Sequence, residues 1–264
     1  MALAECGTHA VLDAAIGPCT TSKIELSREL AGRFTPGMLV LADRGSYGFQ
    51  LWAQAAATGA DLLWRVKTNL RPPVTVRVIE YTIADGREPA ESFWLVTTIM
   101  DHTEASAIEL AAAYAQRWEV ESGFDELKTH QRGPRMVMRS KSPDLVRQEI
   151  WGHLCCDYAI RTLMVDAALH ARRDPDRVSF VAALRIARRS VAQGVFPPPR
   201  PDHAAAIWRH TVLALVRRLN PARRRRSNPR VIKRKISKWR AKRLHHAHWS
   251  QPLHAPEITP QTLN

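Results

Sequence analysis

Runs of apolar residues and helical periodicities predict a regular order of elements in the first 67 residues of the chain. The expected elements are a strand at 9–16, a helix at 22–34, a strand at 38–42, a helix at 50–58 and a strand at 61–67. Ser22 and Glu25 have the spacing of a capping box, so the first helix should begin there. The run at 38–42 is apolar throughout, which is typical of a strand buried on both faces in a central sheet. This order of elements predicts an α/β fold.

The rest of the chain divides into a β-rich segment, a helical segment and a basic end. Apolar runs at 74–83 and 93–100 flank a turn at Asp85-Gly86 and predict two strands. Helical patterns follow at 104–130, 143–172, 178–193 and 204–219. We therefore expect an α/β domain in two parts, 1–67 and 104–195, split by a β insertion at 68–103 and followed at 196–264 by a Pro-rich linker and a basic helical C-terminal region.

The stretch from Tyr114 to Lys128, YAQRWEVESGFDELK, is the most informative of the predicted helices. An α-helix turns by about 100° per residue, so separations of three, four and seven residues keep side chains on one face. One arc of roughly 60° carries four functional side chains: Tyr114, Arg117, Glu121 and Lys128. On helix physics alone, a solvated charged face with ion pairs is the favoured interpretation of this pattern.

Positive charge is concentrated at the C-terminal end of the chain. Of the formal net charge of +14, residues 201–264 contribute 15 Lys and Arg against two acids, whereas residues 1–200 are nearly neutral. Such a basic end favours a polyanionic partner, DNA or RNA before a membrane, with a solubilising tail as the alternative. The candidates for phosphate contacts here are Arg224, Arg225, Lys233 and Lys235.

Cysteine usage and the absence of long apolar runs indicate the compartment. The four cysteines show no CxxC pairing and no interleaved histidines, which predicts reduced core residues. These cysteines are Cys6, Cys19, Cys155 and Cys156. No apolar run of about 18 residues and no signal-peptide pattern occurs, so we expect a cytoplasmic, nucleoid-associated protein that does not enter a membrane.

The histidines do not suggest a metal site from their spacing. Isolated histidines are more often structural or exposed than ligands, and three are isolated in the sequence: His9, His130 and His153. A further group lies in the basic end, at His245, His246, His248 and His254. Adjacent residues in a basic segment make a poor ligand cage, so metal binding there would be adventitious.

Asp43 directly follows the apolar run at 38–42 and precedes Arg44-Gly45. For a single Asp at the end of a strand, a role in a turn or a helix cap is favoured. Together with Glu121, however, it offers hard oxygen ligands suited to Mg²⁺ or Mn²⁺. Two such ions about 4 Å apart can activate a water molecule and stabilise the leaving oxygen of a phosphodiester. Arginine, lysine and tyrosine side chains beside them would then hold the phosphates.

The pattern Y-x2-R-x3-E-x6-K is met at every spacing between 114 and 128, and LADRG occupies 41–45. Together these motifs resemble the insertion-sequence-four family of bacterial DDE transposases, over most of the chain. The resemblance implies a ribonuclease-H-like fold in which three carboxylates bind two Mg²⁺ or Mn²⁺ ions. It also implies an enzyme that cuts double-stranded DNA at transposon ends and joins the 3′ hydroxyl to target DNA, with a homo-oligomer on DNA as a further expectation.

The resemblance assigns roles to individual residues of this chain. By that likeness, Asp43 is the second acidic ligand and Glu121 is the third. The side chains expected to contact the transposon-end backbone are Tyr114, Arg117, Lys128 and, beside the second acidic ligand, Arg44. Some relatives stack a flipped base on an aromatic residue of the β insertion, for which Trp94 or Phe93 is the candidate.

The chain departs from the family pattern at the first catalytic Asp, which would lie upstream of the strand predicted at 9–16. Asp13 is the nearest substitute, but it belongs to a later strand. We therefore expect an N-terminally truncated transposase chain that binds DNA and does not transpose, because one member of its metal triad is missing. The alternatives are a non-catalytic DNA-binding remnant, either an inhibitor or without activity, and a basic protein associated with RNA.

Overall fold

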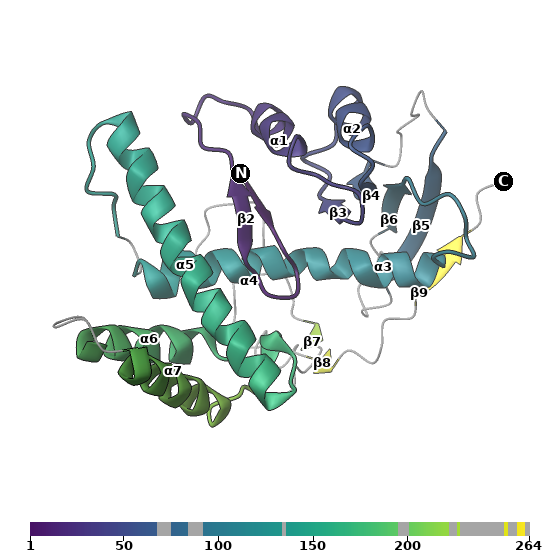
Figure 1. Ribbon diagram of the computed structural model, residues 1–264. Helices are drawn as coiled ribbons and strands as arrows, with labels where there is room; N and C mark the ends of the chain where they lie inside the picture. The colour runs from purple at the N-terminus through teal and green to yellow at the C-terminus, as the bar shows by residue number, and fades with distance from the viewer. Residues whose placement is uncertain are drawn as a thin grey trace.

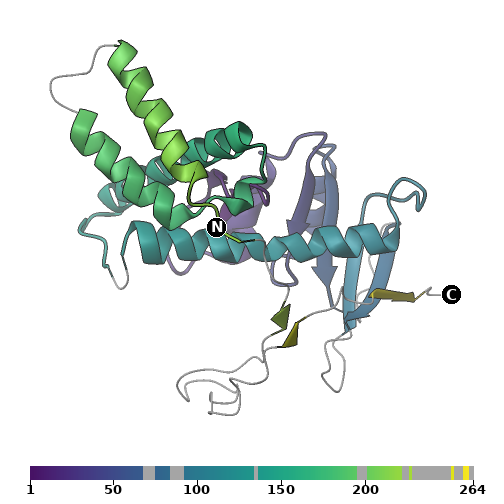
Figure 2. The same ribbon diagram turned by 90° about the horizontal axis from the view of Figure 1, so that it is seen from below.

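The computed structural model describes residues 1–67, 75–83, 92–133, 136–194, 201–221, 226–227, 251–252 and 258–261. In this part of the chain a mixed sheet lies at one end and a group of helices at the other (Figure 1). One long helical run passes beside the sheet and continues to the helical group (Figure 2). The mixed α/β architecture predicted from the sequence is confirmed.

The main sheet contains five described strands in the order β3-β4-β6-β5-β9. They are β3 (Leu39–Ala42), β4 (Asp61–Val66), β6 (Ser92–Thr97), β5 (Arg77–Ile83) and β9 (Ile258–Gln261). Strand β3 is parallel to β4, and every other pairing in this sheet is antiparallel. The two strands predicted in the segment 68–103 therefore extend the same sheet through β4, and the turn predicted at Asp85-Gly86 lies outside the described residues.

Strand β3 confirms the strand predicted at 38–42, but its predicted burial is wrong. Among the described strands β3 is the edge of the sheet, and only β4 pairs with it. Leu39 is 40% exposed and Val40 is buried. A continuous apolar run can thus form an edge strand that pairs with a described strand on one side only. The burial of such a strand cannot be inferred from hydropathy alone.

A separate two-stranded hairpin forms the N-terminal part of the chain. Strand β1 (Ala2–Ala4) pairs antiparallel with β2 (Val11–Ala14), which confirms the strand expected within 9–16. Figure 1 shows this hairpin crossing the long helical run beside helix α5. Its loop therefore approaches the helix that carries the Tyr-Arg-Glu-Lys motif.

Helices α1 (Lys23–Ala31) and α2 (Phe49–Ala56) pack around β4 and close one face of the sheet. The capping box expected at the start of α1 is present, because the Ser22 hydroxyl accepts a hydrogen bond from the Glu25 amide and the Glu25 carboxylate accepts one from the Ser22 amide. Indole rings of α2 and β4 meet edge to face at 5.2 Å. These contacts hold the end of β3 in place.

The helix predicted at 104–130 begins at Ala107, after the N-cap Ser106, and is helical from there to Gln131 but not uniform. It consists of α3 (Ala107–Ala115), a 3₁₀ turn η1 (Gln116–Trp118), α4 (Glu119–Asp125) and a π-helical segment η2 (Glu126–Gln131). Tight and wide turns change the angle between successive side chains, so a wheel of 100° per residue does not hold along the whole run.

The helical group at the other end consists of α5, η3, α6 and α7, whose apolar side chains form one core cluster. Their bounds are α5 (Pro143–Ala171), η3 (Pro175–Arg177), α6 (Phe180–Gly194) and α7 (Pro201–Val216). These helices agree with those predicted at 143–172, 178–193 and 204–219. Two short strands, β7 (Arg226–Ser227) and β8 (Gln251–Pro252), pair with each other further along.

The cysteines are free thiols, as expected, but their predicted place in the core is wrong. Cys19, Cys155 and Cys156 are exposed, and Cys6 is half-buried. Cys155 and Cys156 lie on the exposed side of α5. Which side of a helix a residue faces depends on its position in the helical repeat, and composition does not reveal it. In the described part of the chain, none of the helices has the combination of length and hydropathy that crossing a bilayer requires.

Candidate active site

Asp43 lies at the end of β3, where two parallel strands finish at the same edge of the sheet. The pairing of Ala42 with Trp64 places Asp43 level with Arg65 of β4. The Asp43 carboxylate accepts hydrogen bonds from the Gly45 amide at 2.9 Å and the Ser46 hydroxyl at 3.3 Å. The turn-forming role weighed from the sequence is therefore present, and it fixes the direction of the carboxylate.

The long helical run brings its motif side chains to this edge. Tyr114, in the last turn of α3, is 3% exposed and packs on the apolar cluster between α3 and the sheet. Arg117 follows in η1, and its guanidinium lies 4.7 Å from the centre of the Trp118 ring. Glu121, in α4, lies 4.0 Å from Arg117, which is the outer limit of an ion pair.

A cavity of about 610 Å³ joins the two elements. It is lined by Asp43, Arg44, Gly45, Tyr47, Arg65, Lys67, Tyr114, Arg117, Trp118 and Glu121. Five residues named from the sequence as catalytic or DNA-binding thus share one cavity: Asp43, Arg44, Tyr114, Arg117 and Glu121. Their convergence from a strand end and a helix is what a shared site requires.

The lining carries more positive than negative charge. Four side chains, from Arg44, Arg65, Lys67 and Arg117, are cationic, against the carboxylates of Asp43 and Glu121. Basic side chains in a concave surface attract phosphate groups and position a nucleic-acid backbone. The net positive charge of the lining therefore favours an anionic ligand, which would be held beside the carboxylates of Asp43 and Glu121.

Two buried polar atoms of the lining have no hydrogen-bond partner in the described part of the chain: the Tyr114 hydroxyl and Nε of Arg117. Burial raises the pKa of the Tyr114 hydroxyl, and the positive charge of Arg117 opposes this rise. The hydroxyl thus stays protonated and able to donate at neutral pH. A buried donor without an acceptor costs about 1–3 kcal/mol, which an acceptor on a ligand would relieve.

The divalent metal ion that the sequence resemblance implies can be tested against the donor atoms. Asp43 and Glu121 bring carboxylate oxygens, the ligands that Mg²⁺ and Mn²⁺ prefer, to one cavity. Among the described residues of the lining they are the acidic ones, and the other charged groups are cationic. This set fits one hard cation whose remaining positions are filled by water or phosphate oxygens.

Other predicted site residues lie away from the cavity. Lys128 is in the π-helical segment η2 and is exposed, with Nζ 5.0 Å from the centre of the Phe124 ring. Trp94 packs against the core cluster around β4, and Phe93 stacks on Tyr81 with centroids 5.1 Å apart. Their predicted DNA contacts stay predictions.

Asp13, weighed as a substitute for the first catalytic Asp, is not among the residues that line the cavity. Its carboxylate forms an ion pair of 2.7 Å with Arg33. The candidates in the basic end lie outside the described residues: Arg224, Arg225, Lys233 and Lys235.

Comparison with known proteins places this geometry in a family. The family model described as "Transposase DDE domain" matches residues 2–156, which is more than half of the chain and includes the whole lining of the cavity. The chain belongs to the transposase DDE domain family. The resemblance to insertion-sequence-four DDE transposases drawn from the motif is thereby confirmed.

A curated relative of the family gives the extent of the match. The chain is 27% identical over 270 residues to the transposase InsG for insertion sequence element IS4 of Escherichia coli (strain K12). The aligned region covers 89% of this chain and 59% of that transposase. The chain therefore spans about three fifths of the length of the relative that it matches.

Sequence reasoning missed two groups of residues. Arg65 and Lys67 line the cavity because Arg65 lies near the end of β4 and Lys67 directly follows that strand, a position that the parallel order of β3 and β4 would have indicated. His9, isolated in the sequence and expected to be structural or exposed, is buried among Glu119, Glu126 and Asp176, and the sequence indicated none of these partners. Its partners lie more than 100 residues further along the chain, so no short sequence motif could have predicted these contacts.

Proposed function

We propose that this chain binds the sugar–phosphate backbone of a transposon end in the cavity between β3 and the helical run α3–α4. The observation that carries the proposal is the shared cavity, in which Asp43 and Glu121 lie among four cationic side chains. The Tyr114 hydroxyl and Nε of Arg117 add two buried donors that lack a hydrogen-bond partner among the described residues. Membership of the transposase DDE domain family supports the substrate. The relative's printed name describes a transposase of an insertion sequence element, which agrees with that role.

In this proposal the cationic side chains act first. Arg44, Arg65 and Lys67 attract the DNA backbone and hold it at the ends of β3 and β4. Arg117 donates to a phosphate through its guanidinium, and the Tyr114 hydroxyl donates a hydrogen bond to a phosphate oxygen. Binding would therefore give acceptors to the Tyr114 hydroxyl and to Nε of Arg117, which have none among the described residues.

Asp43 and Glu121 would hold a divalent ion, Mg²⁺ or Mn²⁺, against the phosphate. Such an ion, when bound, makes coordinated water more acidic and neutralises charge on the phosphoryl group. The hydrogen bonds from Gly45 and Ser46 keep the Asp43 carboxylate oriented toward the ion. We propose that two carboxylates hold one ion weakly and that residues 1–264 bind DNA without completing strand transfer.

The experiment uses purified chain 1–264 and a labelled duplex that carries its cognate ends. We expect binding by fluorescence anisotropy, a tenfold or greater loss of affinity in Arg117→Ala, and little change in Arg147→Ala. Arg147 is an exposed arginine of α5, so the control removes the same charge away from the cavity. Equal losses in both variants would overturn the cavity as the binding site.

Cleavage is measured in the same samples with Mg²⁺ or Mn²⁺, by release of 3′ hydroxyl ends. We expect none above background, in the chain and in the double variant Asp43→Asn, Glu121→Gln. Release of ends that disappears in the double variant would overturn the proposed inactivity and establish a working site. An excess of unlabelled RNA is the competitor that separates DNA binding from the alternative of an RNA-associated protein.

The two-carboxylate lining also favours a second candidate, a non-catalytic DNA-binding remnant that inhibits an intact relative. In that case the double variant Asp43→Asn, Glu121→Gln would inhibit transposition by the relative as well as the unaltered chain does. Loss of inhibition in the double variant would argue against it.

A further inference from the structure

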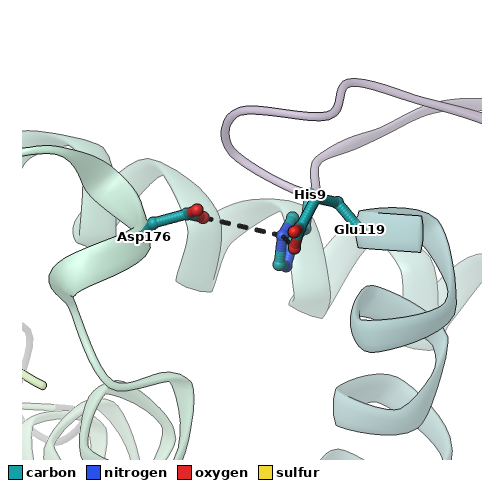
Figure 3. Close-up of side chains that lie close together, drawn as sticks. All are labelled: His9, Glu119 and Asp176. Atoms are coloured by element: carbon teal, nitrogen blue, oxygen red, sulfur yellow. Dashed lines mark hydrogen bonds and ion pairs between the residues drawn. The ribbon is translucent and has the colours of Figure 1, made fainter. Parts of the chain in front are cut away.

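A second group of ligand-type side chains lies away from the cavity, around His9 (Figure 3). His9 comes from the loop between β1 and β2, Glu119 is the first residue of α4, and Asp176 lies in the short helix η3. The imidazole Nε2 is 3.0 Å from a Glu119 carboxylate oxygen and 3.6 Å from one of Asp176. Three segments that are distant in the sequence thus bring one nitrogen and two carboxylates together.

Two features allow His9 to fit at this point: its own backbone conformation and a glycine on the facing helix. His9 has a φ of 60°, in the left-handed region that few side-chain-bearing residues adopt. Gly123 of α4 faces it, and a Cβ added there would lie 3.2 Å from the His9 Cβ and 3.7 Å from its carbonyl oxygen. His9 is 7% exposed, so its imidazole is held inside the protein, where it lies beside the carboxylates of Glu119 and Asp176 (Figure 3).

Both ring nitrogens of His9 face carboxylate oxygens, which a neutral imidazole alone does not satisfy. Nδ1 lies 3.3 Å from Glu126, while Nε2 faces Glu119 and Asp176. A neutral imidazole donates from one nitrogen and presents a lone pair at the other. If Nδ1 donates to Glu126, the Nε2 lone pair points at negative oxygens unless a cation lies between them.

Arg161 holds Glu126 in place and keeps its carboxylate charged, which favours a proton on Nδ1 of His9. Arg161 donates a hydrogen bond of 2.8 Å to the Glu126 carboxylate, and its guanidinium lies 4.3 Å from the centre of the Phe180 ring. Arg161 is 2% exposed, so this support is rigid. A carboxylate that accepts from one ring nitrogen of a histidine orients the other nitrogen as a metal ligand.

We propose that His9, Glu119 and Asp176 bind one divalent transition-metal ion, zinc by the chemistry of the donors, at a site separate from the DNA cavity. The three donor atoms lie within 4.8 Å of one another. In a tetrahedral zinc site with bonds of about 2.0–2.2 Å, neighbouring donors are roughly 3.3–3.5 Å apart. The separations of 3.0 Å and 3.6 Å from His9 Nε2 lie close to this spacing, and the oxygens of Glu119 and Asp176 lie within 4.8 Å of each other, so side-chain movements of about 1 Å would complete the geometry.

The fourth position of the ion belongs to water. A small cavity of about 100 Å³ adjoins the cluster and is lined by His9, Glu126, Arg161 and Asp176 among others. Glu119 and Glu121 stand two residues apart on α4, about 200° around the helix, so this site and the DNA cavity lie on different sides of it. An ion here ties the hairpin loop and η3 to α4, and it acts on stability rather than on phosphoryl transfer.

The test uses the full chain in which His245, His246, His248 and His254 are all replaced by Asn, because those histidines also attract zinc. The metal is removed with a chelator, and zinc is titrated against a coloured competitor in a phosphate-free buffer. We expect one equivalent of zinc per chain and a rise in melting temperature. Co²⁺ in place of zinc should give the visible absorption of a four-coordinate site with nitrogen and oxygen ligands.

Three variants in that background decide the ligands. Asp176→Asn and Glu119→Gln keep size and hydrogen bonding, and we expect zinc affinity to fall at least tenfold in each. His9→Asn should do the same, since Asn tolerates the left-handed backbone that His9 adopts. The matched control, Asp125→Asn, alters an exposed acid of α4 that lines neither cavity and should leave zinc binding unchanged. Glu121→Gln is prepared as well, to test whether zinc binds in the first cavity instead.

Two results would overturn this site. Absence of saturable zinc binding in the chain with the four replaced histidines would leave His9 as a histidinium held by ion pairs alone. Loss of zinc in Glu121→Gln, with retention in Asp176→Asn, would move the ion to the DNA cavity. DNA binding is measured in parallel, so failure of the zinc site is distinguishable from failure of the proposed function.

Discussion

Removal of the Tyr114 hydroxyl should change stability and DNA binding in opposite directions. The hydroxyl is buried, lines the cavity and has no hydrogen-bond partner in the described part of the chain. Tyr114→Phe deletes this atom and leaves the ring in its apolar cluster. Most core substitutions destabilise a protein, so a stabilising result would be specific to an unsatisfied group.

The structure sets the expected magnitudes. An unsatisfied buried hydroxyl costs about 1–3 kcal/mol, and the opening of the cavity to water reduces this, so we expect a gain of about 1 kcal/mol. For a chain of this size that corresponds to a rise in melting temperature of about 2–3 °C. Loss of a hydrogen bond to a phosphate costs about 1.5 kcal/mol, or roughly tenfold in affinity for DNA.

Thermal unfolding of the free chain and anisotropy with a labelled duplex measure the two effects. The matched control is Tyr158→Phe in α5, where the tyrosine is 54% exposed, and neither property should change there. A lower melting temperature in Tyr114→Phe would show that the hydroxyl is satisfied in the free protein. Unchanged DNA affinity would show that Tyr114 does not contact the backbone, and either result refutes the reasoning.

Three further predictions concern packing, a helix cap and the basic end. Gly123→Ala should destabilise the chain by about 1–3 kcal/mol, because the added Cβ would lie 3.2 Å from the His9 Cβ. The control is Gly152→Ala in α5, where the added Cβ has no neighbour within 4 Å and should stabilise the chain by up to about 1 kcal/mol. Urea unfolding measures both changes. A backbone hydrogen bond at the N-cap of α1 lowers the pKa of Glu25, so its contribution is present above the unfolded pKa and is lost as pH falls through the folded pKa. Unfolding curves between pH 6 and pH 3 should therefore converge with those of Glu25→Gln at the acid end, and a constant gap would contradict the cap. Deletion of 223–243 should weaken DNA binding and flatten the slope of log affinity against log salt, and an unchanged slope would remove this segment from the interface.

Features with a local cause could be predicted from the sequence. The capping box at Ser22 and Glu25 depends on four neighbouring residues, and both of its hydrogen bonds are present. Parallel pairing of β3 with β4 follows from the order strand–helix–strand, and it puts Asp43 at a shared edge. The motif spacing correctly grouped Tyr114, Arg117 and Glu121, which line the same cavity. The 3₁₀ turn η1 that contains Arg117 is only three residues long, so it changes the direction of these side chains little.

Features set by distant contacts could not be predicted. The exposure of Leu39 depends on which strands pair with β3, and an apolar run does not encode its neighbours. Lys128 lies in the π-helical segment η2 and does not line the cavity, and propensities do not distinguish a π segment from an α-helix of the same composition. The cluster at His9 joins positions 9, 119 and 176, and only the packing of the hairpin on α4 brings them together.

The arrangement around α4 would allow one helix to serve both proposed sites. Glu121 lines the larger cavity beside Arg117, and Glu119 faces His9 on another side of the helix. A ligand in the cavity interacts with charges on one side only, while the cluster around His9 fixes the rotation of the helix about its axis. Because a rotation of one residue is about 100°, even a fraction of that would carry Glu121 away from Asp43. The contacts of Glu119 and Gly123 with His9 therefore help to position Glu121, the proposed metal ligand, from outside the cavity. His9→Asn should accordingly lower the melting temperature of the chain, and in the absence of a divalent ion it should leave DNA affinity, measured by anisotropy, unchanged.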